Sequence, residues 1–156
     1  NTFIRISYAT TRVSNFHVDT LSVVSPLFSI ANSQQISLEN VSLENVQGDI
    51  DMLMQIRNSQ INSVSNFSAQ DIACTGIDIE NSNVTTLNDL SISNMAHALK
   101  IDSSKVAILS NSVISDCGGS RVNSGAAMSV IDSSITVSNC TFQNNTAQAG
   151  AAIHIA

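Results

Sequence analysis

Five charged side chains recur at matched positions in this chain and could together perform acid–base chemistry. They are Arg57, Asp78, Glu80, Lys100 and Asp102, carried on short stretches of alternating apolar residues. General acid–base catalysis needs one group that donates a proton and one that accepts it, and paired carboxylates beside a cation can supply both. The pattern also has a structural interpretation, because opposite charges that face each other in a sheet stabilise strand register by roughly 0.2–1 kcal/mol.

The strands that must position these side chains belong to a repeat of about 25 residues. Each repeat contains two apolar residues separated by one position, and successive pairs lie 24, 26, 23, 22, 29 and 25 residues apart. The pairs are Ile4/Ile6, Phe28/Ile30, Met54/Ile56, Ile77/Ile79, Leu99/Ile101, Met128/Val130 and Ile153/Ile155. Self-similarity of this period predicts a solenoid with six complete rungs and the start of a seventh.

Two further strands are predicted in every rung. A small polar step such as Asn58-Ser59 turns the chain after the apolar pair, and a second apolar run follows. That run ends two places before an Asn or Asp, at Val13, Leu38, Val64, Leu87, Leu109 and Val137. A third run with period two begins directly after the Asn or Asp, and only 111–114 is out of step. This pattern predicts an all-β fold, a parallel β-helix with about six rungs of three short strands each, as a single segment over residues 1–156.

A leucine-rich repeat is the alternative with a similar period. One rung, from Leu38 to Asn45, fits its spacing, but the other rungs contain too little Leu and a further strand where that repeat needs a helix or extended arm. In the β-helix, rungs stack at roughly 4.8 Å. The five charged residues then point outward from the first strands of three adjacent rungs and form one mixed-charge patch.

A column of Asn and Asp is expected to hold the turn between the second and third strands. Its members are Asn15, Asn40, Asn66, Asp89, Asn111 and Asn139. Three of them begin Asn-x-Ser/Thr sequons, but stacked amides can also hydrogen-bond one another along the axis, and we expect a structural ladder here. Asn83 and Asn144 begin sequons away from this column, so they are the candidates for glycosylation.

The cysteines and histidines show no metal-binding spacing, and nothing in the sequence indicates a cofactor. Cys74 and Cys117 are expected in loops two rungs apart, too far for a bridge without distortion, although either could form an interchain disulfide; Cys140 is expected in the core. The histidines do not converge and are expected to be exposed, with His97 in a loop. The long connection 117–125 should protrude, either as a recognition loop or as an insertion without a partner.

Composition narrows the class of partner. The chain has 43% hydrophobic and 12% charged residues, a net charge of −6 and a pI near 4.6, with 26 Ser and 17 Asn to cover the surface. Without a basic patch it is not expected to bind nucleic acid, and it has no apolar stretch long enough to span a membrane. Because the first and last residues fall in strands without caps, we expect an excerpt of a longer solenoid, with further rungs or self-association.

The last two rungs resemble a known family of repeats. Phe142-Gln143-Asn144-Asn145 precedes Gly150-Ala151-Ala152-Ile153, and Gly125-Ala126-Ala127-Met128 lies one rung earlier. These motifs resemble the FxxN and GGA-I repeats of polymorphic outer-membrane-type surface proteins, with Ala at the second glycine position. The wider pattern is similar to the pectin-lyase-like right-handed parallel β-helix superfamily, and similar Asn- and Ser-rich repeats occur in large bacterial or protist surface proteins.

The resemblance implies two possible functions. Enzymes of the superfamily carry catalytic groups outward on the first strand, where the patch from Arg57 to Asp102 lies, so a polysaccharide lyase or hydrolase, or a glycan-binding module, is one hypothesis. The chain lacks the Asn-Thr-Asp, Asp-Asp, Gly-His-Gly and Arg-Ile-Lys motifs of polygalacturonases at corresponding rungs. The favoured hypothesis is therefore a non-catalytic structural or adhesive segment of a large extracellular surface or filament protein.

Overall fold

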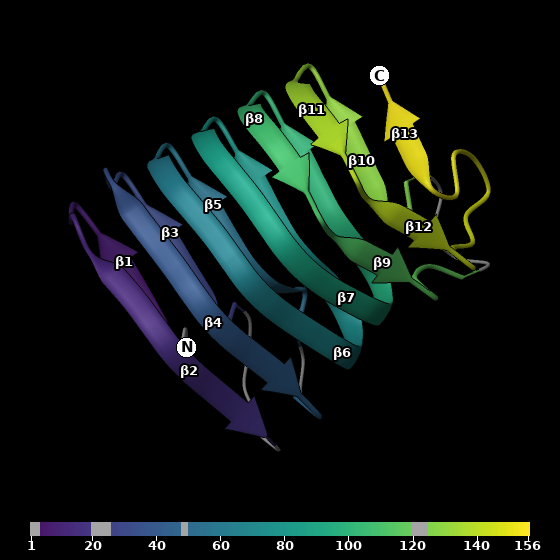
Figure 1. Ribbon diagram of the computed structural model, residues 1–156, viewed down its shortest axis with the longest axis horizontal. Coiled ribbons are helices and arrows are strands. Elements are labelled where there is room, and N and C mark those ends of the chain that lie inside the picture. Colours follow the sequence, from purple (N-terminus) through teal and green to yellow (C-terminus); the bar gives the residue numbers. More distant parts are fainter. Residues whose placement is uncertain (1–3, 20–25, 48–49, 120–124) are drawn as a thin grey trace.

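The chain winds into a solenoid of parallel strands, shown in Figure 1 as a computed structural model. The structure describes residues 4–19, 26–47, 50–119 and 125–156, and no helix occurs among them. The described strands are β1 Ile4–Ser7, β2 Arg12–Asp19, β3 Phe28–Ala31, β4 Ile36–Glu44, β5 Met52–Arg57, β6 Gln60–Glu80, β7 Asn83–Asp102, β8 Lys105–Ser110, β9 Val113–Ser115, β10 Met128–Ile131, β11 Ser134–Ser138, β12 Thr141–Gln143 and β13 Ile153–Ile155.

The register of the first strands is the one predicted from the apolar pairs. Phe28 pairs with Met54 and Ile30 with Ile56 across β3 and β5, and the order β1-β3-β5-β6-β7-β10-β13 continues the same register. The predicted second-strand column is also confirmed, for example where Leu38 pairs with Val64. Because successive side chains of a strand point to opposite faces, this register directs each apolar pair inward and the residue between its members outward.

The described rungs turn at three corners, each with a residue in the left-handed backbone region, and Gln35 is a further left-handed residue just after the corner at Asn32. The first corner contains Tyr8, Asn32, Asn58, Asn81, Ser103 and Asp132; the second contains Asn15, Asn40, Asn66, Asp89, Asn111 and Asn139; the third contains Asn45, Asp71, Asn94, Asp116 and Asn144. Their φ angles lie between 45° and 59°. Asn and Asp enter this region more readily than other residues with a Cβ, which explains why they dominate all three corners.

The second corner bends the chain without ending the strand. β2 and β4 run through this corner, and β6 and β7 run through both the second and third corners. The expected short second and third strands are separate elements in the last two rungs, as β8 with β9 and β11 with β12. At these corners a single left-handed residue redirects the chain while its neighbours stay paired to adjacent rungs, so the strand continues through the turn.

A narrow apolar core fills the solenoid along its axis. Phe28 and Phe67 are among the largest fully buried side chains, and the ring of Phe16 packs edge-on against Phe28 with their centroids 5.3 Å apart. Burial of a side chain of this size stabilises the fold by about 1.5–3 kcal/mol relative to exposure. The core therefore runs through successive rungs as one continuous stack of inward side chains.

Ser112 belongs to this interior, so the expectation that residues 111–114 break the register is wrong. Ile114 pairs with Ile92 in the third-strand register, and Ser112 is 1% exposed. Its hydroxyl donates to the carbonyl of Ser110 at 2.8 Å and accepts from the amide N–H of Leu90 at 3.0 Å. A polar side chain is tolerated at this apolar position because both of these hydrogen bonds are made inside the solenoid.

Candidate functional site

The mixed-charge patch lies on the outward side of β5 and of the C-terminal ends of β6 and β7. These three segments are the first strands of adjacent rungs. Gln55, Asp78 and Lys100 form one column across these strands. Arg57, Glu80 and Asp102 form the column beside it. The structure therefore brings the five predicted charged residues together on three adjacent rungs.

The charges of this patch are largely paired with one another. Arg57 Nε lies 2.8 Å from Glu80 Oε2, and Lys100 Nζ lies 3.7 Å from Asp78 Oδ1. Asp102 Oδ1 accepts a hydrogen bond from the hydroxyl of Ser103 at 2.9 Å. Each carboxylate thus has a local partner, as expected for residues that stabilise strand register.

Asp78 differs from the other members of the patch because it is buried. It is 4% exposed, and its Oδ1 has no hydrogen-bond partner within the described part of the chain. Burial raises the pKa of this carboxyl above its ordinary value, against the lowering effect of Lys100 and Arg57, and the negative charges of Glu80 and Asp102 raise it further. Chemically, Asp78 is the member of the patch best suited to hold and donate a proton.

The second corner carries an axial ladder of side-chain amides. Asn40 Nδ2 donates to Asn15 Oδ1, and Asn66 Nδ2 donates to Asn40 Oδ1, both at 2.9 Å. Farther along, Asn139 Nδ2 donates to Asn111 Oδ1 at 2.7 Å. These hydrogen bonds lie at the positions where the sequence predicts a ladder.

The ladder deviates from the predicted column at Asp89. Asn111 Nδ2 donates at 2.9 Å to Oδ1 of Asn88, the residue before Asp89 in the chain. The Asn88 amide in turn donates to Asp89 Oδ2. A carboxylate has no N–H to pass the chain of donors onward, whereas an amide both donates and accepts. This part of the column therefore ends at Asn88 and Asp89, and Asn66 accepts no hydrogen bond from this rung among the described residues.

The third corner carries a second set of axial hydrogen bonds, which the sequence analysis missed. Asn94 Nδ2 donates to Asp71 Oδ1 at 2.7 Å, and Asn144 Nδ2 donates to Asp116 Oδ1 at 3.1 Å. A signal was present, because each third-corner residue follows its second-corner counterpart by five positions, as in Asn66 and Asp71. Asn144 is therefore a ladder member as well as a sequon.

The first corner is held by serine hydroxyls inside the turn. Ser59 Oγ donates to the carbonyl of Arg57 at 2.7 Å and accepts from the N–H of Ser33 in the preceding rung at 3.1 Å. The same two hydrogen bonds recur at each step through Ser82, Ser104 and Ser133. All three corners thus connect neighbouring rungs through side chains as well as backbone.

Comparison with known families decides where this architecture belongs. Residues 75–156 match the family model described as a right-handed β-helix region. The chain belongs to the right-handed β-helix family. Comparison with curated proteins and with solved structures finds no match. Family membership establishes the fold, and the function must be argued from the residues.

The cysteines of this right-handed β-helix are free thiols. Cys74 lies in β6 and not in the expected loop, and burial raises its pKa to about 12, with the charge of Asp51 adding to the increase. Cys117 is also buried, which raises its pKa. Cys140 is half-buried against the core. Burial of Cys74 and Cys117 counts against the interchain disulfide, because a thiol must be reached and deprotonated to exchange.

The histidines of the β-helix lie on separate rungs. His97 is in β7, not in the expected loop, and its Nδ1 lies 3.3 Å from the carbonyl oxygen of Gly125. His154 lies in β13 and is half-buried, with no hydrogen-bond partner for Nδ1 in the described residues, whereas His17 on β2 is exposed. The expectation of exposure is therefore wrong for His97 and His154.

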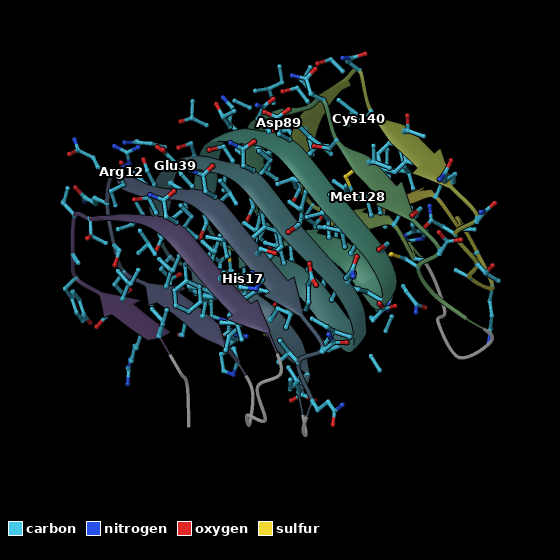
Figure 2. All side chains as sticks on the ribbon, turned by 60° about the horizontal axis from the view of Figure 1, so that its bottom comes forward. Arg12, His17, Glu39, Asp89, Met128 and Cys140 are labelled. Atoms are coloured by element: carbon cyan, nitrogen blue, oxygen red, sulfur yellow. The ribbon has the colours of Figure 1, made fainter. Side chains whose placement is uncertain are left out.

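Figure 2 shows Arg12 of β2 beside Glu39 of β4, where the two side chains form an exposed ion pair. Across the described ranges, no group of three His, Cys, Asp or Glu residues is arranged to hold a metal ion. The residues described contain no helix long and apolar enough to cross a membrane. The centre of the predicted protruding loop, 120–124, lies outside the described residues.

Proposed function

We propose that this β-helix is a non-catalytic segment of a larger extracellular surface or filament protein, in which it acts as a stiff spacer and an adhesive or assembly surface. The observation that carries the proposal is the set of axial side-chain ladders at all three corners. These hydrogen bonds add to the backbone bonds between rungs, so bending the axis would stretch both kinds. Such reinforcement suits a part that transmits force or sets a distance.

The mixed-charge patch supports the same proposal through its pairing. A catalytic carboxylate needs access to a substrate, but the Asp78 carboxylate is buried and Glu80 is engaged by Arg57 at 2.8 Å. None of the five patch residues lines the hollows at the neighbouring first corner. The reactive residues of an enzyme usually line a cleft, so a catalytic patch would be expected to line one.

Particle shape tests the spacer. Negative-stain electron microscopy of the native full-length protein should show a rod or filament in which each rung adds roughly 4.8 Å of length. Six rungs at that rise span only about 30 Å, so solution scattering from the 156-residue chain should give a short particle whose cross-section matches that of the rod. Isolated compact particles of the full-length protein would contradict the spacer role.

The second candidate is a polysaccharide-acting enzyme, which the raised pKa of Asp78 favours. In that case Asp78 would donate a proton to the leaving oxygen, and an ionised neighbour such as Asp102 would accept one. The test is release of unsaturated or reducing sugar ends from an acidic polysaccharide. Activity that disappears in both Asp78→Asn and Asp102→Asn, and survives in Glu39→Gln, would support the enzyme and displace the spacer.

A further inference from the structure

A shallow groove follows the first corner along the axis of the solenoid. Three adjoining hollows of about 270, 440 and 380 Å³ compose it. The first two share Asn32 and Gln34, and the second and third share Asn81 and Asn83. We call this continuous feature, which runs from Tyr8 to Asp132, the first-corner groove.

Six exposed amide side chains line the middle of this groove. They are Asn32, Gln34, Asn58, Gln60, Asn81 and Asn83. None of these side-chain amides has a hydrogen-bond partner among the described residues, in contrast to the second corner, where Asn15, Asn40 and Asn66 bond one another. The first-corner groove therefore presents a row of unused donors and acceptors.

The fold itself requires only half of these amides. Asn32, Asn58 and Asn81 have positive φ, so their identity follows from the turn. The other three, Gln34, Gln60 and Asn83, have ordinary backbone angles and lie at or just before the start of the second strand. Any small polar residue would serve there, so backbone geometry leaves the repeated amides unexplained.

The floor of the groove offers a ligand nothing further to bond. The serine hydroxyls beneath the amides already donate and accept, as Ser59 does. The backbone is also paired, since the Gln60 N–H donates to Ser33 O and the Asn83 N–H donates to Ser59 O, both at 2.9 Å. A peptide that binds by adding a strand needs free backbone groups, and this corner has none to offer at those positions.

We propose that the first-corner groove binds an uncharged oligosaccharide chain. Each amide can donate to one sugar hydroxyl and accept from another, and the amides recur at roughly 4.8 Å, a spacing that suits an extended chain. No charged residue lines the central hollow, and Lys105 and Asp132 enter only at the far end. At the near end Tyr8 is 84% exposed, which leaves its ring free to stack on a sugar face.

This binding role goes beyond the spacer, because a stiff rod does not need the groove. It also differs from the enzyme hypothesis, which uses the neighbouring mixed-charge patch and an acidic polymer. The groove contains Asn83, one of the two candidate glycosylation sites. A glycan attached there would fill the site, so the two uses of Asn83 exclude each other.

Calorimetry with defined hexasaccharides tests the proposal on the chain produced without N-glycosylation. The neutral probes are hexamers of β-1,4-glucose, β-1,4-xylose, β-1,4-mannose and β-1,3-glucose, and the charged probe is hexagalacturonate. The groove variant combines Gln34→Ala, Gln60→Ala and Asn83→Ala. The matched control combines Asn62→Ala, Gln70→Ala and Gln143→Ala, three exposed amides outside the groove. Tyr8→Asn, which installs the residue most common in that corner column, removes the ring and retains the turn.

At least one neutral hexamer should bind, and the groove variant should raise its Kd by roughly tenfold or more while the control leaves it unchanged. Tyr8→Asn should also weaken binding, whereas Asp78→Asn should not. The proposal is overturned if no neutral hexamer binds, if the control weakens binding as much as the groove variant, or if only hexagalacturonate binds. Dimerisation through the amides without sugar binding, or a glycan on Asn83 in the native protein, would also overturn it. Unchanged thermal unfolding of the groove variant confirms that a loss of binding reflects the removed amides.

Discussion

Removing one hydroxyl from the serine column should measure how much the first corner contributes to stability. In Ser82→Ala the N–H of Ser59, a buried residue, loses the acceptor that lies 3.1 Å away. The carbonyl of Glu80 loses the Ser82 hydroxyl but still accepts from the N–H of Asn58 at 3.2 Å. The net cost is therefore one unsatisfied buried N–H, about 1–3 kcal/mol. For a chain of 156 residues, a loss of about 2 kcal/mol lowers Tm by roughly 4–8 °C.

Urea unfolding followed by circular dichroism, with Tm from calorimetry, gives the required difference. Ser91→Ala is the matched control, since Ser91 is exposed and its hydroxyl has no partner among the described residues. Ser82→Cys should fall between the two, because the Cys117 thiol donates to the carbonyl two residues back at 3.2 Å but is a weaker acceptor. A Ser82→Ala variant within about 0.5 kcal/mol of the control would refute the reasoning.

Two further substitutions probe the core and the patch. Ile79→Asp buries an unpaired charge in a fully buried position, so it should cost several kcal/mol and expose the amides of β5 to β7 to hydrogen exchange, whereas Ile79→Val should cost about 0.5–1.5 kcal/mol. Normal protection in Ile79→Asp would show that the register is wrong. Because the pKa of Asp78 is raised in the native state, the native carboxyl keeps its proton over a pH range in which the unfolded one has released it. Wild-type stability should therefore fall as pH rises from the ordinary Asp pKa of 3.8 through the raised pKa. Asp78→Asn should match the wild type below that pH and become relatively more stable toward pH 7; a variant that instead loses stability over this range, measured by urea unfolding, would contradict the burial argument.

The strand register could be predicted from the sequence because it depends on a simple property. Apolar residues at alternate positions must point inward, so the pair Ile77/Ile79 determines which residues face it on the next rung. The same alternation placed Arg57, Asp78 and Lys100 on one surface. Local periodicity is sufficient for these features because the fold repeats the same contacts in every rung.

The side-chain hydrogen bonds could be predicted less well, because they depend on geometry that periodicity does not encode. Asn88 and Asp89 lie together at the second corner, and alternation does not indicate that Asn111 donates to Asn88, the residue outside the predicted column. The burial of Asp78 likewise depends on how its neighbours' side chains lie over it. Ser112 breaks the apolar pattern although it keeps the register, because its hydroxyl can replace an apolar group where an N–H and a carbonyl are within its reach.

The contrast between the first and second corners follows from the residue that comes after each left-handed position. At five of the six first-corner positions this residue is a serine whose hydroxyl accepts from the preceding rung, so these rungs are connected without the side chain of the left-handed residue. At the second corner it is usually apolar, as in Phe67 after Asn66, and the axial side-chain connection there is made by the amide. Where Ser112 follows Asn111, both kinds of connection are present: the Ser112 hydroxyl accepts from the Leu90 N–H, and the Asn111 amide donates to Asn88 and accepts from Asn139. At the first corner the serines make the side-chain connection between rungs, and the amides of the first-corner groove have no hydrogen-bond partner among the described residues.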